Sequence, residues 1–368
     1  MPSENFESEV VVVNATALDK SGALTILKQF VNHASQDKTN HYLCFIPCNV
    51  DFEITDNITF IKKAKMGWLS RIVWDSAGLK KYINNNGLIV KKIISLQNTS
   101  VNFDCEQIIY LHQPLPFSNI KWSLFKKDEA IFFLYKHFYK FFIFLFSTKN
   151  TQYVVQTEWM KGVLSSDCKI NSNNIFVIKP DIKLPSTSHK QKEGAAYGHV
   201  LLYPATPLVY KNHDVILDAL KILKSENRID GIKFQVTFKG EEYPLFKNKV
   251  NRLGLSNNID YLGTISYSEL VQKYENASIV LFPSYIETFG LPLAEGATLN
   301  KPILCSDLPF SRDVLHGYLG ATYLDYQDPL GWANAIKKTL KEIDSNSLDC
   351  GNFEFKQSSS WKDFFKLI

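Results

Sequence analysis

The amino-acid sequence predicts an α/β protein built from two parallel-sheet domains. The chain has 368 residues, which is more than a single hydrophobic core normally serves. Short apolar stretches typical of strands alternate with stretches of helical periodicity, and this alternation favours doubly wound parallel sheets. A polar stretch at 181–197 divides the pattern into two arrays and is typical of a linker. We therefore expect a first domain at 1–180, a second domain at 198–350 and a separate C-terminal segment at 351–368.

The first array contains seven candidate strands. Each is a short run of branched or aromatic apolar residues, as expected for a buried strand. They lie at residues 10–14, 41–46, 57–61, 90–96, 107–111, 152–156 and 174–178. After the first strand, apolar residues spaced for one face of a helix follow at Leu24, Leu27, Val31 and Ala34.

The second array repeats this organisation. A helix is predicted over 213–226, and helical patterns separate most of the other strands. The candidate strands lie at residues 199–205, 232–240, 257–263, 278–284, 301–307 and 321–325. The chain then ends in an amphipathic tail that carries Trp361, Phe364 and Phe365.

Composition favours a soluble globular enzyme. Hydrophobic residues make up 45% of the chain and charged residues 21%, which excludes a mainly disordered protein. The net charge of +4 is too mild to indicate nucleic acid as the partner. The six cysteines lack metal-site spacing, and the N-terminus shows no secretory signal, so we expect reduced thiols and a cytoplasmic location.

The segment ETFGLPLAE, from Glu287 to Glu295, has the composition of a phosphate-binding loop. It follows a candidate strand, Gly290 gives the turn backbone freedom, and Pro292 suits the start of a helix. A helix N-terminus presents unpaired N–H groups and the positive end of a dipole, so it suits an anion such as a diphosphate. Glu287 in the loop and Glu295 in or near the first helical turn are then placed to hydrogen-bond hydroxyl groups on either side of that anion.

With the strand-like stretches around it, this segment resembles the donor-site signature of the retaining nucleotide-sugar glycosyltransferases of family 4 (glycosyl transferases group 1). The resemblance covers nearly the whole chain, strongly in the second half and weakly in the first. It implies the GT-B fold, in which two Rossmann-like parallel-sheet domains face a central cleft and a C-terminal helix crosses back to the first domain. The first domain would bind the acceptor and the second the nucleotide sugar.

The resemblance assigns roles in the second domain. It implies that Lys211 pairs with the leaving diphosphate, although a lysine at a helix start is by itself usually just solvated. Many relatives carry an arginine five residues earlier, where this chain has Thr206. Glu287 would hold sugar hydroxyls, and Glu295 would hold ribose hydroxyls. The remaining donor-binding residues implied are Thr288, Phe289, Gly290 and Leu291 in the loop, and Gly240, Gly263 and Thr264 around the base.

Two sites in the first domain are also candidates. Ser21 and Gly22 follow the first strand, where a glycine lets the backbone approach a ligand, but an ordinary turn explains them nearly as well. His112 lies at the end of another strand. In relatives a histidine at a comparable position contacts the donor sugar near the reacting carbon, whereas a lone histidine more often caps a strand or hydrogen-bonds in the core.

The chemistry implied is transfer of a sugar from a nucleoside diphosphate sugar to a hydroxyl acceptor with retention of configuration. A lipid-linked oligosaccharide or a surface polysaccharide precursor, such as lipopolysaccharide, is the expected acceptor. Because no D-x-D motif is present, we expect neither a metal ion nor a cofactor. Two alternatives stay open: a nucleotide-sugar epimerase of the same fold, and a catalytically silent sugar-binding subunit, which the absence of an arginine at Thr206 would suit.

The segment Ala130–Phe146 is crowded with Phe and Tyr and interrupted by Lys136, His137 and Lys140. It is too short and too basic for a membrane span. One interpretation is a buried helix of the first domain. The other is an aromatic, basic surface that touches an anionic bilayer, which would make the protein peripheral on the inner face of the membrane.

Overall fold

The chain forms two separate α/β units in the computed structural model, which describes residues 9–182, 198–354 and 360–368. The first unit comprises Met1–Asp181 with Gln357–Ile368, and the second comprises Ile182–Lys356. Most of the predicted linker at 181–197 lies outside the described residues.

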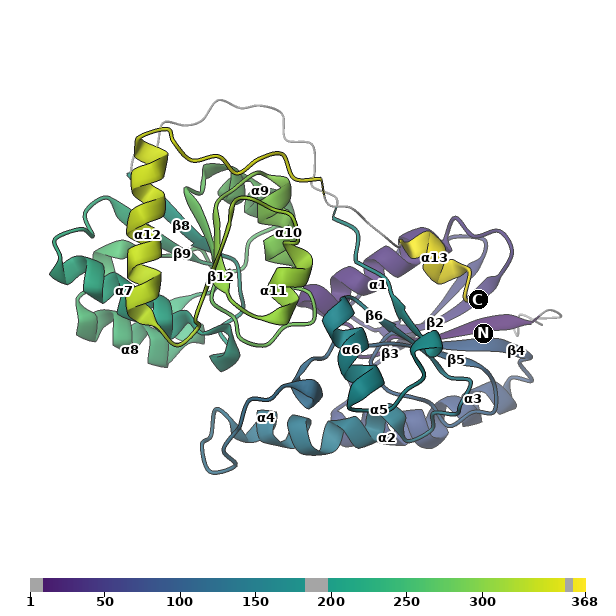
Figure 1. The fold of residues 1–368 in the computed structure, drawn as a ribbon. Helices are drawn as coiled ribbons and strands as arrows, with labels where there is room; N and C mark the ends of the chain where they lie inside the picture. Colours follow the sequence, from purple (N-terminus) through teal and green to yellow (C-terminus); the bar gives the residue numbers. More distant parts are fainter. Residues whose placement is uncertain (1–8, 183–197, 355–359) are drawn as a thin grey trace. The chain divides into compact units, whose positions relative to one another are not determined.

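The first unit is built on a seven-stranded parallel sheet with the order β3-β2-β1-β4-β5-β6-β7. Strands β2 to β6 are labelled in Figure 1. All seven predicted strands are confirmed. Strand β1 is apolar except for Asn14 because helices cover both faces of a doubly wound sheet. The strands are β1 Val10–Asn14, β2 His41–Pro47, β3 Ile58–Lys63, β4 Val90–Ser95, β5 Gln107–Tyr110, β6 Gln152–Val155 and β7 Ile175–Val177.

Two of the helical stretches in this unit are interrupted by a π-helical turn. Helix α2 (Trp68–Val73) continues through the π turn η1 (Trp74–Gly78) into α3 (Leu79–Asn85). Likewise α4 (Ala130–Leu134) continues through η3 (Tyr135–Tyr139) into α5 (Lys140–Phe144). The other helical segments are α1 Ser21–Ala34, η2 Leu115–Phe117, α6 Glu158–Ser166, η4 Ser172–Asn174 and α13 Trp361–Phe365.

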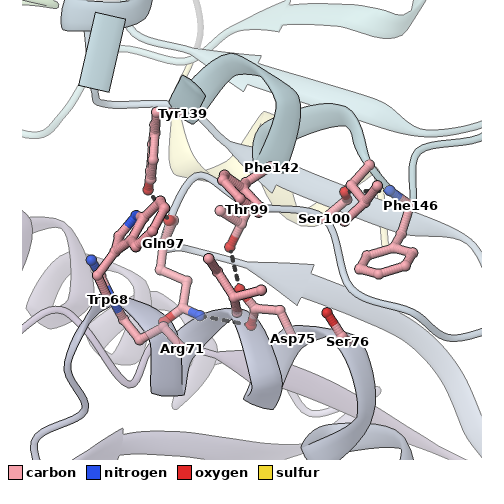
Figure 2. A pocket seen from close by; sticks show the side chains of 12 residues that line it. Trp68, Arg71, Asp75, Ser76, Gln97, Thr99, Ser100, Tyr139, Phe142 and Phe146 are labelled. Atoms are coloured by element: carbon pink, nitrogen blue, oxygen red, sulfur yellow. Dashed lines mark hydrogen bonds between the residues drawn. The ribbon is translucent and has the colours of Figure 1, made fainter. Parts of the chain in front are cut away.

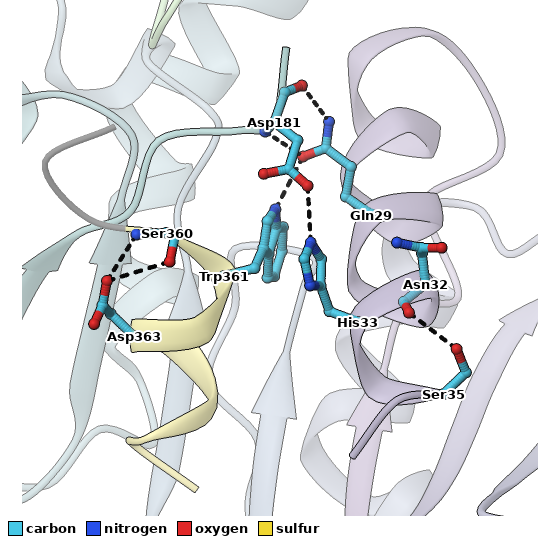
Figure 3. Close-up of polar contacts among 8 residues, drawn as sticks. All are labelled: Gln29, Asn32, His33, Ser35, Asp181, Ser360, Trp361 and Asp363. Carbon is cyan, nitrogen blue, oxygen red and sulfur yellow. Dashed lines mark hydrogen bonds and ion pairs between the residues drawn. The ribbon is translucent and has the colours of Figure 1, made fainter. Parts of the chain in front are cut away.

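The C-terminal helix α13 packs on the first unit, as predicted. Trp361 and Phe364 are fully buried in the same core as Phe30 of α1, and the Trp361 ring stacks on Tyr110 at 5.6 Å between centroids. Figure 3 shows the polar contacts at this junction. The Gln29 side-chain oxygen accepts hydrogen bonds from the Trp361 indole N–H at 3.0 Å and from the Asp181 amide at 2.9 Å.

The second unit is built on a six-stranded parallel sheet with the order β10-β9-β8-β11-β12-β13. All six predicted strands are confirmed, so both sheets have the predicted parallel α/β character. Strand β9 ends at Val236, four residues before the apolar pattern does, because its neighbour β8 pairs with it only as far as Tyr203. The strands are β8 His199–Tyr203, β9 Ile232–Val236, β10 Ile259–Tyr261, β11 Ile279–Phe282, β12 Ile303–Ser306 and β13 Ala321–Leu324.

Helices alternate with these strands. Six α-helices of this unit are described: α7 His213–Ser225, α8 Pro244–Leu253, α9 Tyr267–Asn276, α10 Leu291–Thr298, α11 Pro309–Val314 and α12 Pro329–Asp344. Short 3₁₀ turns precede three of the elements: η5 Val209–Lys211, η6 Gly240–Glu242 and η7 Ser256–Asn258.

Candidate functional site

The loop between β11 and α10 turns at Gly290. This residue is the N-cap of α10 and has a φ of +83°, a left-handed conformation that L side chains rarely adopt. Pro292 is the second residue of the helix. The loop residues Thr288 and Phe289 are buried and Leu291 is half-buried, so the turn is held by packing on both sides.

Substituting Gly290 with alanine is expected to lower the free energy of unfolding by about 1–3 kcal/mol. A Cβ atom there would lie 3.1 Å from Phe282 Cζ and 3.2 Å from Leu293 Cδ1, in addition to the unfavourable φ. Thermal unfolding measures the loss. The matched control is Gly317→Ala, because Gly317 has a φ of +82° but a Cβ atom there would have nothing within 4 Å. Equal losses of unfolding free energy in the two variants would show that the close contacts with Phe282 and Leu293 do not contribute.

Lys211 and Glu287 form an ion pair, and the side chain of each is 15% exposed. Lys211 ends the 3₁₀ turn η5 after β8, and the Tyr203 hydroxyl donates to its backbone oxygen at 2.8 Å. Glu287 lies in the loop after β11. Strands β8 and β11 are neighbours, and they stand where the strand order of the second sheet reverses. Open α/β sheets bind ligands at this point, beyond the carboxyl ends of the strands.

Glu295 lies in the second turn of α10, one residue beyond the first turn. The residue is only 6% exposed, and its carboxylate accepts a hydrogen bond from the Tyr274 hydroxyl at 2.8 Å. Burial raises the pKa of Glu295, and the hydroxyls of Tyr274 and Tyr267 oppose that rise. Since Tyr267 opens helix α9, the loop after β10 reaches the side chain of Glu295.

The predicted base-binding residues lie at the neighbouring strand ends. Gly240 opens η6 after β9, and a Cβ there would meet Lys247 at 3.1 Å. Gly263 follows β10 with a φ of +69°, and Thr264 next to it is exposed. The second unit thus brings Lys211, Glu287, Gly290, Glu295 and these loops to one edge of its sheet.

In the first unit, His112 lies just past β5 and is half-buried. Its ring Nε2 lies 2.8 Å from the Leu96 carbonyl oxygen, and its backbone N–H donates to Asn98 Oδ1 at 2.7 Å. Burial lowers the pKa of His112, which favours the neutral ring.

Ser21 and Gly22 are the first residues of α1, so the predicted glycine-bearing loop is the start of a helix. Gly22 is exposed, and a Cβ atom at this position would have nothing within 4 Å. Within this unit its position does not require a glycine.

A buried polar network in the first unit was not predicted. The carboxylate of Asp75 accepts hydrogen bonds from Asn14 at 2.8 Å, Gln97 at 3.0 Å and Thr99 at 2.7 Å. Figure 2 shows the bonds from Gln97 and Thr99. Asn14 ends β1, and Gln97 and Thr99 follow β4. The sequence feature that could have indicated this network is the polar residue Asn14 at the end of the otherwise apolar strand VVVVN.

The aromatic segment Ala130–Phe146 is helical as far as Phe144 and has one buried and one exposed face. Tyr139 and Ile143 are buried in the first unit, whereas five large apolar side chains are exposed at helical spacing. The exposed residues are Ile131, Leu134, Phe138, Phe141 and Leu145. In the part of the chain that the structure describes, no helix has the length and apolarity that a membrane crossing requires.

Comparison with known proteins gives a family match and a fold match. Residues 187–349 match the family "Glycosyl transferases group 1". The O-antigen chain mannosyltransferase RfbU of Salmonella typhimurium is 25% identical over 256 residues, which are 67% of this chain and 64% of that relative. This chain therefore aligns with less than two thirds of that relative's length.

Two solved structures resemble the whole fold. Anabaena HepE in complex with UDP and glucose has a TM-score of 0.68 at 14% identity, covering 94% of this chain and 93% of that one. WaaG, a glycosyltransferase involved in lipopolysaccharide biosynthesis, has a TM-score of 0.67 at 13% identity and covers 92% of each chain. Residues 187–349, which make up most of the second unit, thus match the glycosyl transferases group 1 family, and the chain has the GT-B fold of two Rossmann-like parallel-sheet units.

Proposed function

We propose that this protein is a glycosyltransferase that moves a sugar from a nucleoside diphosphate sugar to a hydroxyl group of a surface polysaccharide or lipid-linked precursor. The observation that carries the proposal is the grouping of Lys211, Glu287 and the start of α10 at the switch point of the second sheet. The family match of the same unit supports it, and the O-antigen relative supports the class of acceptor.

The expected chemistry is stabilisation of a departing diphosphate. Negative charge grows on this group as the anomeric bond breaks, and a fixed cation and a helix N-terminus stabilise that charge more in the transition state than in the ground state. We assign the cation to Lys211, and the helix dipole to α10 with Thr288, Phe289, Gly290 and Leu291 at its entrance. With Thr206 in place of an arginine, Lys211 carries more of this task.

The other donor contacts follow from the same arrangement. Glu287, held beside the leaving group by Lys211, is assigned to sugar hydroxyls, and Glu295 to the ribose. Gly240, Gly263 and Thr264 are assigned to the base. In the first unit, the neutral His112 is assigned to orienting the donor sugar, with Ser21 and Gly22 as further binding residues. We expect retention of configuration and no requirement for a metal ion, so activity should survive EDTA.

The test is a panel of UDP-, GDP- and dTDP-sugars, scored by the rise in melting temperature and by nucleotide release with candidate acceptors. One donor should stabilise the chain and release nucleotide only when an acceptor is present. Binding without turnover across the panel would instead favour a silent sugar-binding subunit. Conversion of the sugar without release would favour an epimerase.

Replacing Glu295 with alanine should weaken binding of that donor by roughly 10- to 100-fold, because the ribose loses hydrogen bonds to a charged group. The donor-dependent rise in melting temperature should fall accordingly. Glu226→Ala, an exposed acidic residue at the end of α7, serves as the control. A full shift in the Glu295 variant would exclude the ribose assignment.

We also propose that the first unit docks on an anionic bilayer. The exposed stripe of α4, η3 and α5 lies next to α2, where Trp68, Leu69 and Val73 are exposed as well. The Trp68 and Phe142 rings lie 5.3 Å apart and join the two elements. Segments 68–82 and 121–145 together carry eight Lys and Arg against three Asp and Glu, a net +5 in a chain of net +4. An apolar stripe within basic segments fits an anionic lipid surface.

The lysines that sequence reasoning singled out in this segment are less available than expected. Lys136 donates a hydrogen bond to the Ile120 carbonyl oxygen, and Lys140 lies over the Phe117 ring at 5.5 Å. Lys126 and Lys127, just before the helix, are exposed. Lys126 pairs with Glu129 at 3.0 Å, so Lys127 is the better placed of the two to meet lipid phosphates.

A Phe138→Ser/Phe141→Ser double variant should therefore bind phosphatidylglycerol vesicles about 30-fold more weakly than wild type. Each ring is a little over half exposed, so each contributes about 1 kcal/mol on insertion. Sedimentation with vesicles measures the bound fraction. An Ile54→Ser/Leu319→Ser variant removes two apolar side chains elsewhere that are more exposed than these phenylalanines, and it should bind as wild type. Equal recovery of both variants and wild type in the supernatant would contradict membrane docking.

A further inference from the structure

A buried carboxylate in the first unit has no role in the donor chemistry proposed above. Asp75 is 6% exposed and belongs to the π turn η1. Its Oδ1 accepts hydrogen bonds from the side-chain amides of Asn14 and Gln97, and its Oδ2 accepts one from the Thr99 hydroxyl. Because Asn14 ends β1 and the other two residues follow β4, Asp75 joins a strand end to the turn at 96–99. π turns are frequent at functional sites, which favours a functional role for this carboxylate.

The two amides that contact Asp75 have fixed orientations. The Gln97 Oε1 atom accepts from the Thr16 hydroxyl at 3.0 Å, and the Asn14 Oδ1 atom accepts from the Trp74 indole N–H at 3.1 Å. Both amides therefore direct their N–H groups at position 75, where a group that only accepts is required. Burial raises the pKa of Asp75 to about 6, so the carboxylate is mostly ionised at neutral pH and its charge strengthens these hydrogen bonds.

The turn at 96–99 connects Asp75 to His112. Gln97 and Thr99 hydrogen-bond to Asp75, as Figure 2 shows, whereas Asn98 between them contacts His112. The Asn98 Oδ1 atom accepts from the His112 backbone N–H at 2.7 Å. Asn98 has a φ of 71°, a left-handed conformation that asparagine adopts more readily than most residues. The turn is therefore held by Asp75 through two of its side chains and holds His112 through the side chain between them.

The same turn determines which ring nitrogen of His112 carries the proton. Nε2 lies 2.8 Å from the backbone oxygen of Leu96, the first residue of the turn. A carbonyl oxygen only accepts hydrogen bonds, so Nε2 is the N–H of the neutral ring and Nδ1 carries the lone pair. The Asn98 Nδ2 atom, 3.5 Å from Nε2, is too distant to compete with this bond. Among the described residues none hydrogen-bonds to Nδ1, which is left to accept a hydrogen bond from a ligand.

We propose that Asp75 is a positioning residue for His112. By fixing the turn at 96–99, the carboxylate keeps the His112 ring in the Nε2–H tautomer and presents Nδ1 to a hydroxyl group of the donor sugar. The bond from Nε2–H to Leu96 fixes both the tautomer and the orientation of the ring. The contact of Nδ1 with the sugar rests on the proposed function, whereas the state of the ring can be measured without any ligand.

The test is NMR of the histidine rings in the ¹⁵N-labelled full chain at pH 7. Wild type should show a protected Nε2–H proton and an unprotonated Nδ1 for His112, identified by the loss of these signals in His112→Gln. Asp75→Ala should speed exchange of the Nε2–H proton with water by about tenfold or more, because the turn is released. Gln97→Met is the second variant, since it keeps the length of the side chain and leaves Asp75 paired with two partners while cutting one link to the turn.

Trp74→Phe is the matched control. It removes an indole hydrogen bond to Asn14 from the same π turn but none to the turn at 96–99. The Nε2–H proton of His112 should therefore exchange in this variant as in wild type, even where stability falls. A merely structural role for Asp75 predicts that all three variants leave the His112 ring unchanged as long as they fold.

Three results would overturn the proposal. They are a proton on Nδ1 of His112 in wild type, an unchanged ring in folded Gln97→Met and Asp75→Ala, and an equal change in the Trp74 control. These measurements contain no nucleotide sugar, so failure of the proposed glycosyl transfer would not affect them. Conversely, an unchanged ring with nucleotide release retained would leave the proposed function in place.

The contact with the sugar has its own measurement. Gln97→Met should weaken binding of the donor found in the panel by about fivefold, but not binding of the free nucleoside diphosphate, which has no sugar for His112 to contact. Melting-temperature shifts with the two ligands give the comparison. Equal weakening of both ligands would exclude a sugar-specific role for the turn.

Discussion

Replacing Lys211 with methionine should slow nucleotide release by about 10²- to 10³-fold, which corresponds to roughly 2.7–4 kcal/mol of transition-state stabilisation. Methionine keeps much of the length of the side chain but removes the charge that faces Glu287 and, in the proposed mechanism, the departing diphosphate. Because the Thr206 side chain carries no charge, we expect little compensation from that position. Steady-state kinetics with the donor found in the panel measure the effect.

The control for this prediction is Lys221→Met. Lys221 is exposed on α7, the helix that follows Lys211. The loss should appear mainly in kcat, because the charge acts on the group as it leaves rather than on the bound donor alone. A Lys211 variant with a raised KM and an unchanged kcat would show that the lysine only binds the donor.

The second large effect concerns pH and His213, the first residue of α7. Its side chain is 1% exposed, and both ring nitrogens lack a hydrogen-bond partner among the residues that the structure describes. Aromatic rings surround it, with Tyr203 at 4.6 Å and Phe238 at 5.1 Å between centroids. Burial, with Lys211 adding repulsion, lowers the pKa of His213 to about 3.

The sign of the effect follows from proton binding. In the unfolded chain the pKa of histidine is about 6.5, so between pH 6.5 and 3 the unfolded chain binds a proton that the folded chain does not. The contribution of the neutral, buried His213 to the free energy of unfolding is fully present above pH 6.5. It is lost as the pH falls, so that the free energy of unfolding is lower by about 2–3 kcal/mol at pH 4.5. His213→Phe should remove this loss and also remove two unpaired polar atoms from the core.

Urea unfolding of wild type and His213→Phe at pH 7 and pH 4.5 gives the comparison, with hydrogen exchange of the β8 and α7 peptides to localise it. His316→Gln, an exposed histidine in the same unit, is the control. The difference in unfolding free energy between wild type and the Phe variant isolates the effect of His213 from that of Asp75. The raised pKa of Asp75 stabilises the folded chain as the pH falls from 6 to 4, which is the opposite effect. Equal acid sensitivity of wild type and the Phe variant would contradict the prediction.

The sequence carried enough information to place every strand but not to pair the site residues. Branched apolar runs identify strands because a parallel sheet is buried on both faces. Lys211 and Glu287 could each be placed at a strand end, yet they are 76 positions apart. Their ion pair forms because β8 and β11 are neighbours in the sheet. The order of strands in a sheet cannot be predicted from local periodicity.

The polar network of the first unit could not be predicted from the sequence for a related reason. Asp75 lies in a helical stretch, and a regular helical wheel gives no sign that a π turn shifts the residues after it. Its partners come from β1 and from the turn after β4, so the network exists only in the folded unit. The turn at Gly290, by contrast, could be predicted from the sequence. A glycine just before a helix with proline in its first turn indicates a backbone turn at that glycine.

The contact between α13 and α1 has a consequence for the order of folding. The core of the first unit includes Trp361 and Phe364, which follow the whole second unit in the sequence. During synthesis, the ribosome must therefore translate the second unit before the first can bury its Phe30 surface. Asp181 and Trp361, on either side of that insertion, hydrogen-bond to the same Gln29 side chain (Figure 3). One glutamine of α1 thus marks both the point where the chain leaves the first unit and the point where it returns to complete it.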